Sequence, residues 1–275
     1  MAQVPAEIRR RKARQKAKGQ PPKALPGDQP QLLQARVWGL TLWQWAGTVI
    51  LFAAAFLRLI FLSHKVLHHD EGVNGLFMVS LFRNGYYHYD PSNYHGPSLY
   101  YAGLVTSSIA SFFMGKDGLN TFTIRLVPAI FGVGVVWLML CLRRQLGTFG
   151  ALCAAALATV SPGFVFFSRY FIHEILFVFF TLGVIVAWLR YRETGQPRSL
   201  MLAAASAALL GATKETWVIT AGVWLIAIPC TAIYFRLAEK LFSRVPDQEQ
   251  QAAAVSGSAW TRSELYFYPA LLFVG

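Results

Sequence analysis

Long apolar segments dominate this sequence, and their length limits what the chain can fold into. Seven of them cover residues 41–63, 98–114, 121–142, 147–167, 175–191, 198–212 and 216–236. A membrane-spanning helix needs roughly 20 mainly apolar residues. The chain is 55% hydrophobic and 14% charged, whereas soluble domains carry about 25% charged residues. The sequence therefore predicts an all-α fold, a polytopic transmembrane helical bundle.

The two ends of the chain differ from this apolar body. Residues 1–36 hold nine Lys and Arg residues against two acids, and they are rich in proline. We expect a disordered, basic tail that touches anionic membrane lipid and stays in the cytoplasm, with no nucleic acid as partner. A transmembrane domain should fill residues 37–275. An eighth apolar run starts near Tyr266, so we expect the chain to be an N-terminal piece of a longer protein.

The positions of the basic residues predict the topology. If all seven segments crossed the membrane, Arg143–Arg144 and Arg190 would lie outside, against the positive-inside rule. Placing segment 98–114 on the outer surface returns both clusters to the cytoplasm. This arrangement has six complete spans and a long external loop at 64–120. The protein is then a multi-pass protein of the cell (inner) membrane.

The external loop has a helical pattern of its own. Val73, Leu76, Phe77 and Leu81 recur at spacings of three and four residues. This periodicity predicts an amphipathic helix that lies on the membrane.

Acidic and histidine side chains gather at the predicted outer face. His68, His69, Asp70 and Glu71 open the surface helix, where the helix dipole favours carboxylates. Glu174 begins an inward span on the same side. Helix capping explains a single acid at each place, whereas carboxylates on one membrane face suit acid–base chemistry or metal binding. A divalent cation held by Asp70, Glu71 and Glu174 would fit this chemistry, although no spacing rule supports it.

Several basic and polar residues lie at the same predicted face. They are Arg58, His95, Arg125, Arg169, Lys214 and Glu215. Charges placed near hydrocarbon are costly and mark functional sites, although long side chains also extend to the headgroups. Together Arg58, Arg125, Arg169 and Lys214 can hold a lipid phosphate, and all six residues are candidates for substrate binding.

The order of the motifs resembles the GT-C superfamily of glycosyltransferases. The stretches that carry the resemblance are His69-Asp70-Glu71-Gly72, Tyr89-Asp90-Pro91, Tyr94-His95-Gly96-Pro97, Arg125-Leu126-Val127-Pro128-Ala129 and Ser168-Arg169-Tyr170. They are most similar to the dolichyl-phosphate-mannose protein mannosyltransferase-like group, in its branch of flippase-activity-associated proteins. The resemblance covers about residues 45–220.

The resemblance implies a polyprenyl-phosphate-linked sugar as donor and a hydroxyl of a glycan, lipid or protein as acceptor. It also implies an extracytoplasmic active site and juxtamembrane helices in the first loop. Asp70 would be the base toward the acceptor, Glu71 its partner and Glu174 the second acid. His69 and His95 would lie at the substrate.

Two other functions compete with this one. A lipid-linked sugar flippase or transporter without catalysis would place polar residues at mid-membrane and use broken helices, whereas the polar residues here lie at one end of the spans. A membrane scaffold would depend on the basic tail and not on Asp70 or Glu174.

Overall fold

The computed structural model describes residues 35–242, except 88, 91, 93 and 94. Residues 1–34 of the predicted basic tail and the apolar run near Tyr266 lie outside the described residues, and Arg36 at the end of that tail lies in a short strand. The chain forms two compact units, Met1–Thr213 and Lys214–Gly275, and each is described by itself.

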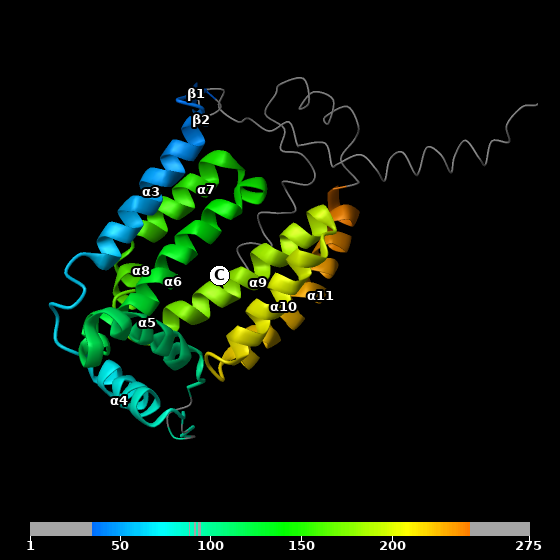
Figure 1. Cartoon of the computed structure of the whole chain (residues 1–275). Coiled ribbons are helices and arrows are strands. Elements are labelled where there is room, and N and C mark those ends of the chain that lie inside the picture. The colour runs from blue at the N-terminus through cyan, green and yellow to red at the C-terminus, as the bar shows by residue number, and fades with distance from the viewer. Residues whose placement is uncertain (1–34, 88, 91, 93–94, 243–275) are drawn as a thin grey trace, which may run out of the picture. The chain divides into compact units, whose positions relative to one another are not determined.

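The described chain is almost entirely helical, as predicted (Figure 1). A two-stranded hairpin, β1 (Arg36–Val37) and β2 (Leu40–Thr41), precedes the first helix. The helices of the first unit are α3 (Leu42–Leu59), α4 (His69–Asn84), α5 (Ser98–Met114), the 3-10 helix η1 (Gly115–Gly118), α6 (Thr121–Cys141), α7 (Arg143–Val160), α8 (Pro162–Phe167), α9 (Glu174–Thr194) and α10 (Pro197–Gly211). The second unit contributes α11 (Trp217–Phe242).

Helix α6 is the centre of the first unit. It packs against α3, α7 and α9, and 56% of its apolar stretch is buried, compared with 17% for α3 and 22% for α9. A Cβ atom at Gly134 would come 2.6 Å from the ring of Phe179 on α9, so these two helices pack tightly at Gly134. Helices α4 and α5 gather beyond one end of the long helices (Figure 1).

Four helices within the described residues are long and apolar enough to cross a membrane: α3, α6, α9 and the Trp217–Ala238 part of α11. The prediction of six complete spans is therefore met only in part. The expected span 147–167 is divided, because α7 ends at Val160 and α8 starts at Pro162. The expected span 198–212 is the 15-residue helix α10, about 22 Å long against a hydrocarbon core of about 30 Å.

The helix predicted between the first two apolar segments is confirmed as α4, and its placement on the membrane stays a prediction. The side chains that it buries are Glu71, Asn74, Met78 and Leu81. Of the four predicted apolar positions only Leu81 belongs to this set, and Leu76 is 72% exposed. Apolar periodicity identified the helix, but the side that packs against protein carries the polar residues.

The break between α7 and α8 is stabilised by an arginine from another helix. Pro162 has no N–H, so the carbonyl of Ala158 has no partner within its own helix. The guanidinium of Arg58 on α3 is fully buried and donates to Ala158 O at 3.1 Å and to Thr159 O at 3.4 Å. Its Nε donates to Ser168 Oγ at 3.2 Å. Arg58 thus caps the C-terminus of α7 across the helix interface.

Replacing Arg58 with Met should lower the thermal stability of the protein. The substitution leaves buried carbonyl groups at the end of α7 without donors, which costs about 1–3 kcal/mol for each group. Thermal unfolding of the detergent-purified protein measures the effect. The control is Arg83→Met, because Arg83 is an exposed residue in the last turn of α4. Equal melting temperatures of the two variants would contradict the capping role.

Candidate active site

The first turn of α4 is built around its own capping groups. His68 is the N-cap residue, and its Nδ1 accepts the N–H of Asp70 at 3.4 Å. The N–H of His68 donates back to Glu71 Oε2 at 3.1 Å. This reciprocal pattern fixes where the helix begins. It also sends the neighbouring acids in different directions, because successive side chains on a helix point about 100° apart.

The carboxylate of Glu71 is the buried centre of the site. It is 0% exposed and accepts the Nε and Nη2 of Arg125, both at 2.7 Å. Its Oε1 also accepts the backbone N–H of Phe171 at 2.8 Å. Burial alone would raise the pKa of Glu71, but the hydrogen bonds from Arg125, Phe171 and His68 lower it below its ordinary value of 4.5. Glu71 is therefore a carboxylate in a closed ion pair.

Arg125 uses every donor that it has. Besides Glu71, its Nη1 donates to Leu62 O and Lys65 O, both at 2.9 Å, and its Nη2 donates to Val66 O at 3.1 Å. A guanidinium has five N–H groups, and these five hydrogen bonds occupy them all. Arg125, which is 1% exposed, holds the loop between α3 and α4. All its donors are engaged within the protein, and its predicted role in binding a lipid phosphate stays a prediction.

The other two arginines of the predicted phosphate site also bind backbone carbonyls. Arg58 is buried and binds carbonyls at the end of α7, and its part in phosphate binding likewise stays a prediction. Arg169 is only half-buried, and it donates to Leu57 O at 2.7 Å and Phe61 O at 3.2 Å. Since these two bonds leave part of its guanidinium unused, Arg169 stays a candidate for phosphate binding.

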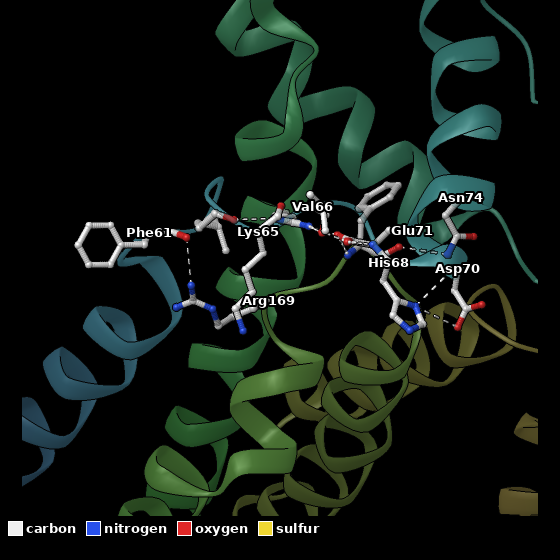
Figure 2. Close-up of polar contacts among 11 residues, drawn as sticks. Phe61, Lys65, Val66, His68, Asp70, Glu71, Asn74 and Arg169 are labelled. Carbon is white, nitrogen blue, oxygen red and sulfur yellow. Dashed lines mark hydrogen bonds and ion pairs between the residues drawn. The ribbon is translucent and has the colours of Figure 1, made fainter.

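Asp70 lies on the outside of this network. Its side chain is 65% exposed, and its carboxylate is 3.7 Å from Nδ1 of His68. His69 is exposed as well. Figure 2 shows Glu71 turned toward the loop that carries Lys65 and Val66, with Asp70 beside the ring of His68. The two acids, which sequence reasoning paired as catalytic groups, thus have different surroundings.

The turn before α9 meets the first turns of α4. Phe171 is 0% exposed and is held by the carboxylate of Glu71. The chain then passes through the buried His173 to Glu174, which starts α9. The structure therefore brings the two predicted acidic segments, around Asp70 and around Glu174, to the same end of the first unit.

His95 joins this end through a turn that requires glycine. Its ring lies 4.6 Å from that of His173, and His173 Nε2 is 3.1 Å from Gly96 O. The N–H of Gly96 donates to Thr213 O at 3.1 Å. A Cβ atom at Gly96 would come 2.5 Å from the carbonyl carbon of Ala212, so only glycine fits. The His95-Gly96-Pro97 stretch therefore ties the segment between α4 and α5 to the end of α10.

The remaining predictions have mixed outcomes. Lys214 and Glu215 belong to the second unit, so their part in substrate binding stays a prediction. Across the described portion of the chain no group of three or more His, Cys, Asp and Glu side chains could hold a metal ion. A cation on Asp70, Glu71 and Glu174 is unsupported, because both oxygens of Glu71 are already engaged by Arg125 and backbone N–H groups.

Sequence reasoning missed two residues of this region. Asn74 lies one turn after Glu71 on the buried face of α4, and Tyr100 approaches it from α5. Spacing offered one signal, since Asn74 follows Glu71 at i+3 and so shares its side of the helix. No comparable signal marks Tyr100, because it lies among several tyrosines of the external loop.

Comparison with known proteins gives two matches. The model of the dolichyl-phosphate-mannose-protein mannosyltransferase family matches residues 98–255. A solved structure, the S. cerevisiae protein O-mannosyltransferase Pmt1-Pmt2 complex bound to the sugar donor, is similar with a TM-score of 0.57 and 18% sequence identity. The match covers 89% of this chain but only 32% of that chain, so this sequence spans about a third of its length. No curated protein matched the sequence.

The ion pair of Glu71 predicts a pH dependence of stability. Glu71→Gln should lower the melting temperature at neutral pH, because removing one partner of a buried ion pair costs about 3–5 kcal/mol. The folded-state pKa of Glu71 is below 4.5. The ionised Glu71 of the wild type therefore stabilises the folded protein above that pH, and this stabilisation is lost as the pH falls through the folded-state pKa. The difference in melting temperature should therefore shrink in acid.

The control for this experiment is Glu193→Gln. Glu193 pairs with the exposed Arg144 at 2.8 Å, and exposed pairs contribute only about 0–1 kcal/mol. A Glu71→Gln difference that stays constant from neutral pH to acid would contradict the buried ion pair.

Proposed function

Because the chain belongs to the dolichyl-phosphate-mannose-protein mannosyltransferase family, we propose that it is a membrane glycosyltransferase. It transfers a sugar from a polyprenyl-phosphate donor to an acceptor hydroxyl, and it does so on the extracytoplasmic face of the cell membrane. The family name indicates mannose as the sugar and a protein hydroxyl as the acceptor. The apolar helices α3, α6 and α9 support a multi-pass membrane protein.

One observation carries the proposal: an exposed carboxylate is fixed to a rigid, buried network. Asp70 is 65% exposed, while the next residue, Glu71, is locked by Arg125 and Phe171. A general base needs access to its substrate and a fixed position. Asp70 meets both requirements, whereas Glu71 is inaccessible and serves to position the helix turn that carries Asp70.

The proposed reaction is a direct displacement. Asp70 takes the proton of the acceptor hydroxyl while the acceptor oxygen forms a bond to the anomeric carbon of the sugar. The bond from that carbon to the phosphate oxygen breaks, and its electron pair leaves with the polyprenyl phosphate. Negative charge grows on this phosphate, and a positioned cation stabilises it. Arg169 is the candidate for that role, because it is half-buried and part of its guanidinium is unused.

Glu174 supplies the second carboxylate of the site. It is the first residue of α9 and follows the turn that Glu71 holds. We assign it to orient the acceptor or sugar hydroxyl groups, since an ionised carboxylate accepts hydrogen bonds only. His95 and His173 line the same end.

Replacing Asp70 with Asn should reduce sugar transfer strongly. A general base contributes about 100-fold to 10,000-fold to the rate, and Asn keeps the shape of the side chain without the basic oxygen. The assay uses the protein in proteoliposomes, polyprenyl-phosphate mannose as donor and a threonine-rich peptide as acceptor. Glu174→Gln should also reduce transfer, while Glu193→Gln, the same substitution at the other end of α9, should not.

Two results would contradict the proposal. Unchanged transfer by Asp70→Asn would remove Asp70 from the reaction. Movement of the donor across the vesicle membrane without any glycosylated peptide would favour the lipid-linked sugar flippase instead.

A further inference from the structure

Asn74 and Glu71 together hold one residue of the turn before α9. The Nδ2 of Asn74 donates to Phe171 O at 3.1 Å, and the N–H of Phe171 donates to Glu71 Oε1 at 2.8 Å. Both polar groups of this peptide residue are therefore bound by side chains one helical turn apart on α4. Asn74 is 3% exposed and Phe171 is 0% exposed. Figure 2 shows Asn74 beside Glu71 and Asp70.

Tyr100 on α5 adds a third side chain to this arrangement. We call Glu71, Asn74 and Tyr100, which together hold Phe171, the clamp. The hydroxyl of Tyr100 donates to Asn74 Oδ1 at 2.8 Å, so the amide of Asn74 is oriented by one partner on each side. The ring of Tyr100 is 1% exposed and lies edge-on to His173, with 5.3 Å between ring centroids. Tyr100 thus contacts the same turn two residues beyond Phe171, next to Glu174.

The packing around Tyr100 leaves little freedom. One turn later, a Cβ atom at Gly103 would come 3.0 Å from Met78 Sδ and 3.1 Å from the ring of Phe171. Helix α5 therefore lies close against both α4 and the turn, and small shifts of one element move the others. A buried and fully paired polar group of this kind specifies one arrangement of the backbone.

We propose that Asn74 and Tyr100 are positioning residues that fix Glu174 relative to Asp70. This inference rests on the proposed function, because it assigns the two residues to the same reaction. Asp70 lies in the first turn of the helix that carries Asn74, and Glu174 follows the clamped Phe171 by three residues. Releasing the clamp displaces one carboxylate from the other, and a misplacement of about 1 Å far from the chemistry costs about 100-fold in rate.

The test is a double-mutant cycle on the transfer reaction. Asn74→Leu should lower kcat about 100-fold, and the milder Tyr100→Phe about tenfold, the size expected for one lost hydrogen bond. In a Glu174→Gln background both substitutions should lose most of their effect, because they act through Glu174. The donor is polyprenyl-phosphate mannose and the acceptor is the same threonine-rich peptide.

Matched controls separate this role from general damage. Asn84→Leu is the control for Asn74→Leu, because Asn84 lies at the exposed end of the same helix, α4. Tyr101→Phe is the control for Tyr100→Phe, because Tyr101 is its exposed neighbour on α5. Both controls should keep wild-type kcat. Effects of Asn74→Leu and Tyr100→Phe that simply add to that of Glu174→Gln would overturn the positioning role.

A second measurement does not depend on activity. Backbone amide hydrogen exchange in residues 171–176 should become faster in Asn74→Leu and Tyr100→Phe, but not in the two controls. If the wild-type protein transfers no sugar, the proposed function fails, and this measurement still tests the clamp. Unchanged exchange in both variants would overturn it.

Discussion

The buried ion pair of Glu71 and Arg125 is the interaction on which the rest of the site depends. Taking two charges out of water is expensive and needs near-complete hydrogen bonding in return. Here the carboxylate accepts four hydrogen bonds and the guanidinium donates five. These partners come from α4, from α6, from the loop after α3 and from the turn before α9. One ion pair therefore joins four segments that are far apart in the sequence.

A second constraint explains why arginine is used so often. Backbone groups inside a membrane need partners from the protein, because hydrocarbon offers none. At three places where the chain leaves regular helix, an arginine side chain binds backbone carbonyls. Arg58 does so at the end of α7, Arg125 in the loop after α3 and Arg169 at the end of α3. These three arginines thus bind the backbone of the protein itself.

These arginines also mark what the sequence could and could not predict. Apolar length predicted the helices, and the order of acids and motifs predicted that Asp70, Glu174 and His95 share one end of the bundle. The partners of Arg58 and Arg125 were not predictable, because they are carbonyls whose direction depends on the folded loop. The side of α4 that packs against protein was not predictable for a related reason. Apolar periodicity finds a protein core in water, but in a membrane protein an apolar side chain such as Leu76 is also stable when exposed.

The geometry of a helix start gives adjacent acids different roles. Asp70 and Glu71 are consecutive, so only one of them can face the protein interior. The buried position binds Arg125 and lowers the pKa of Glu71, which removes that carboxylate from proton exchange at neutral pH. The exposed position keeps a carboxylate that a substrate can reach. In the function we propose, Glu71 takes no part in the reaction and instead holds the first turn of α4 in place. Asp70 can act as a base because this turn positions it.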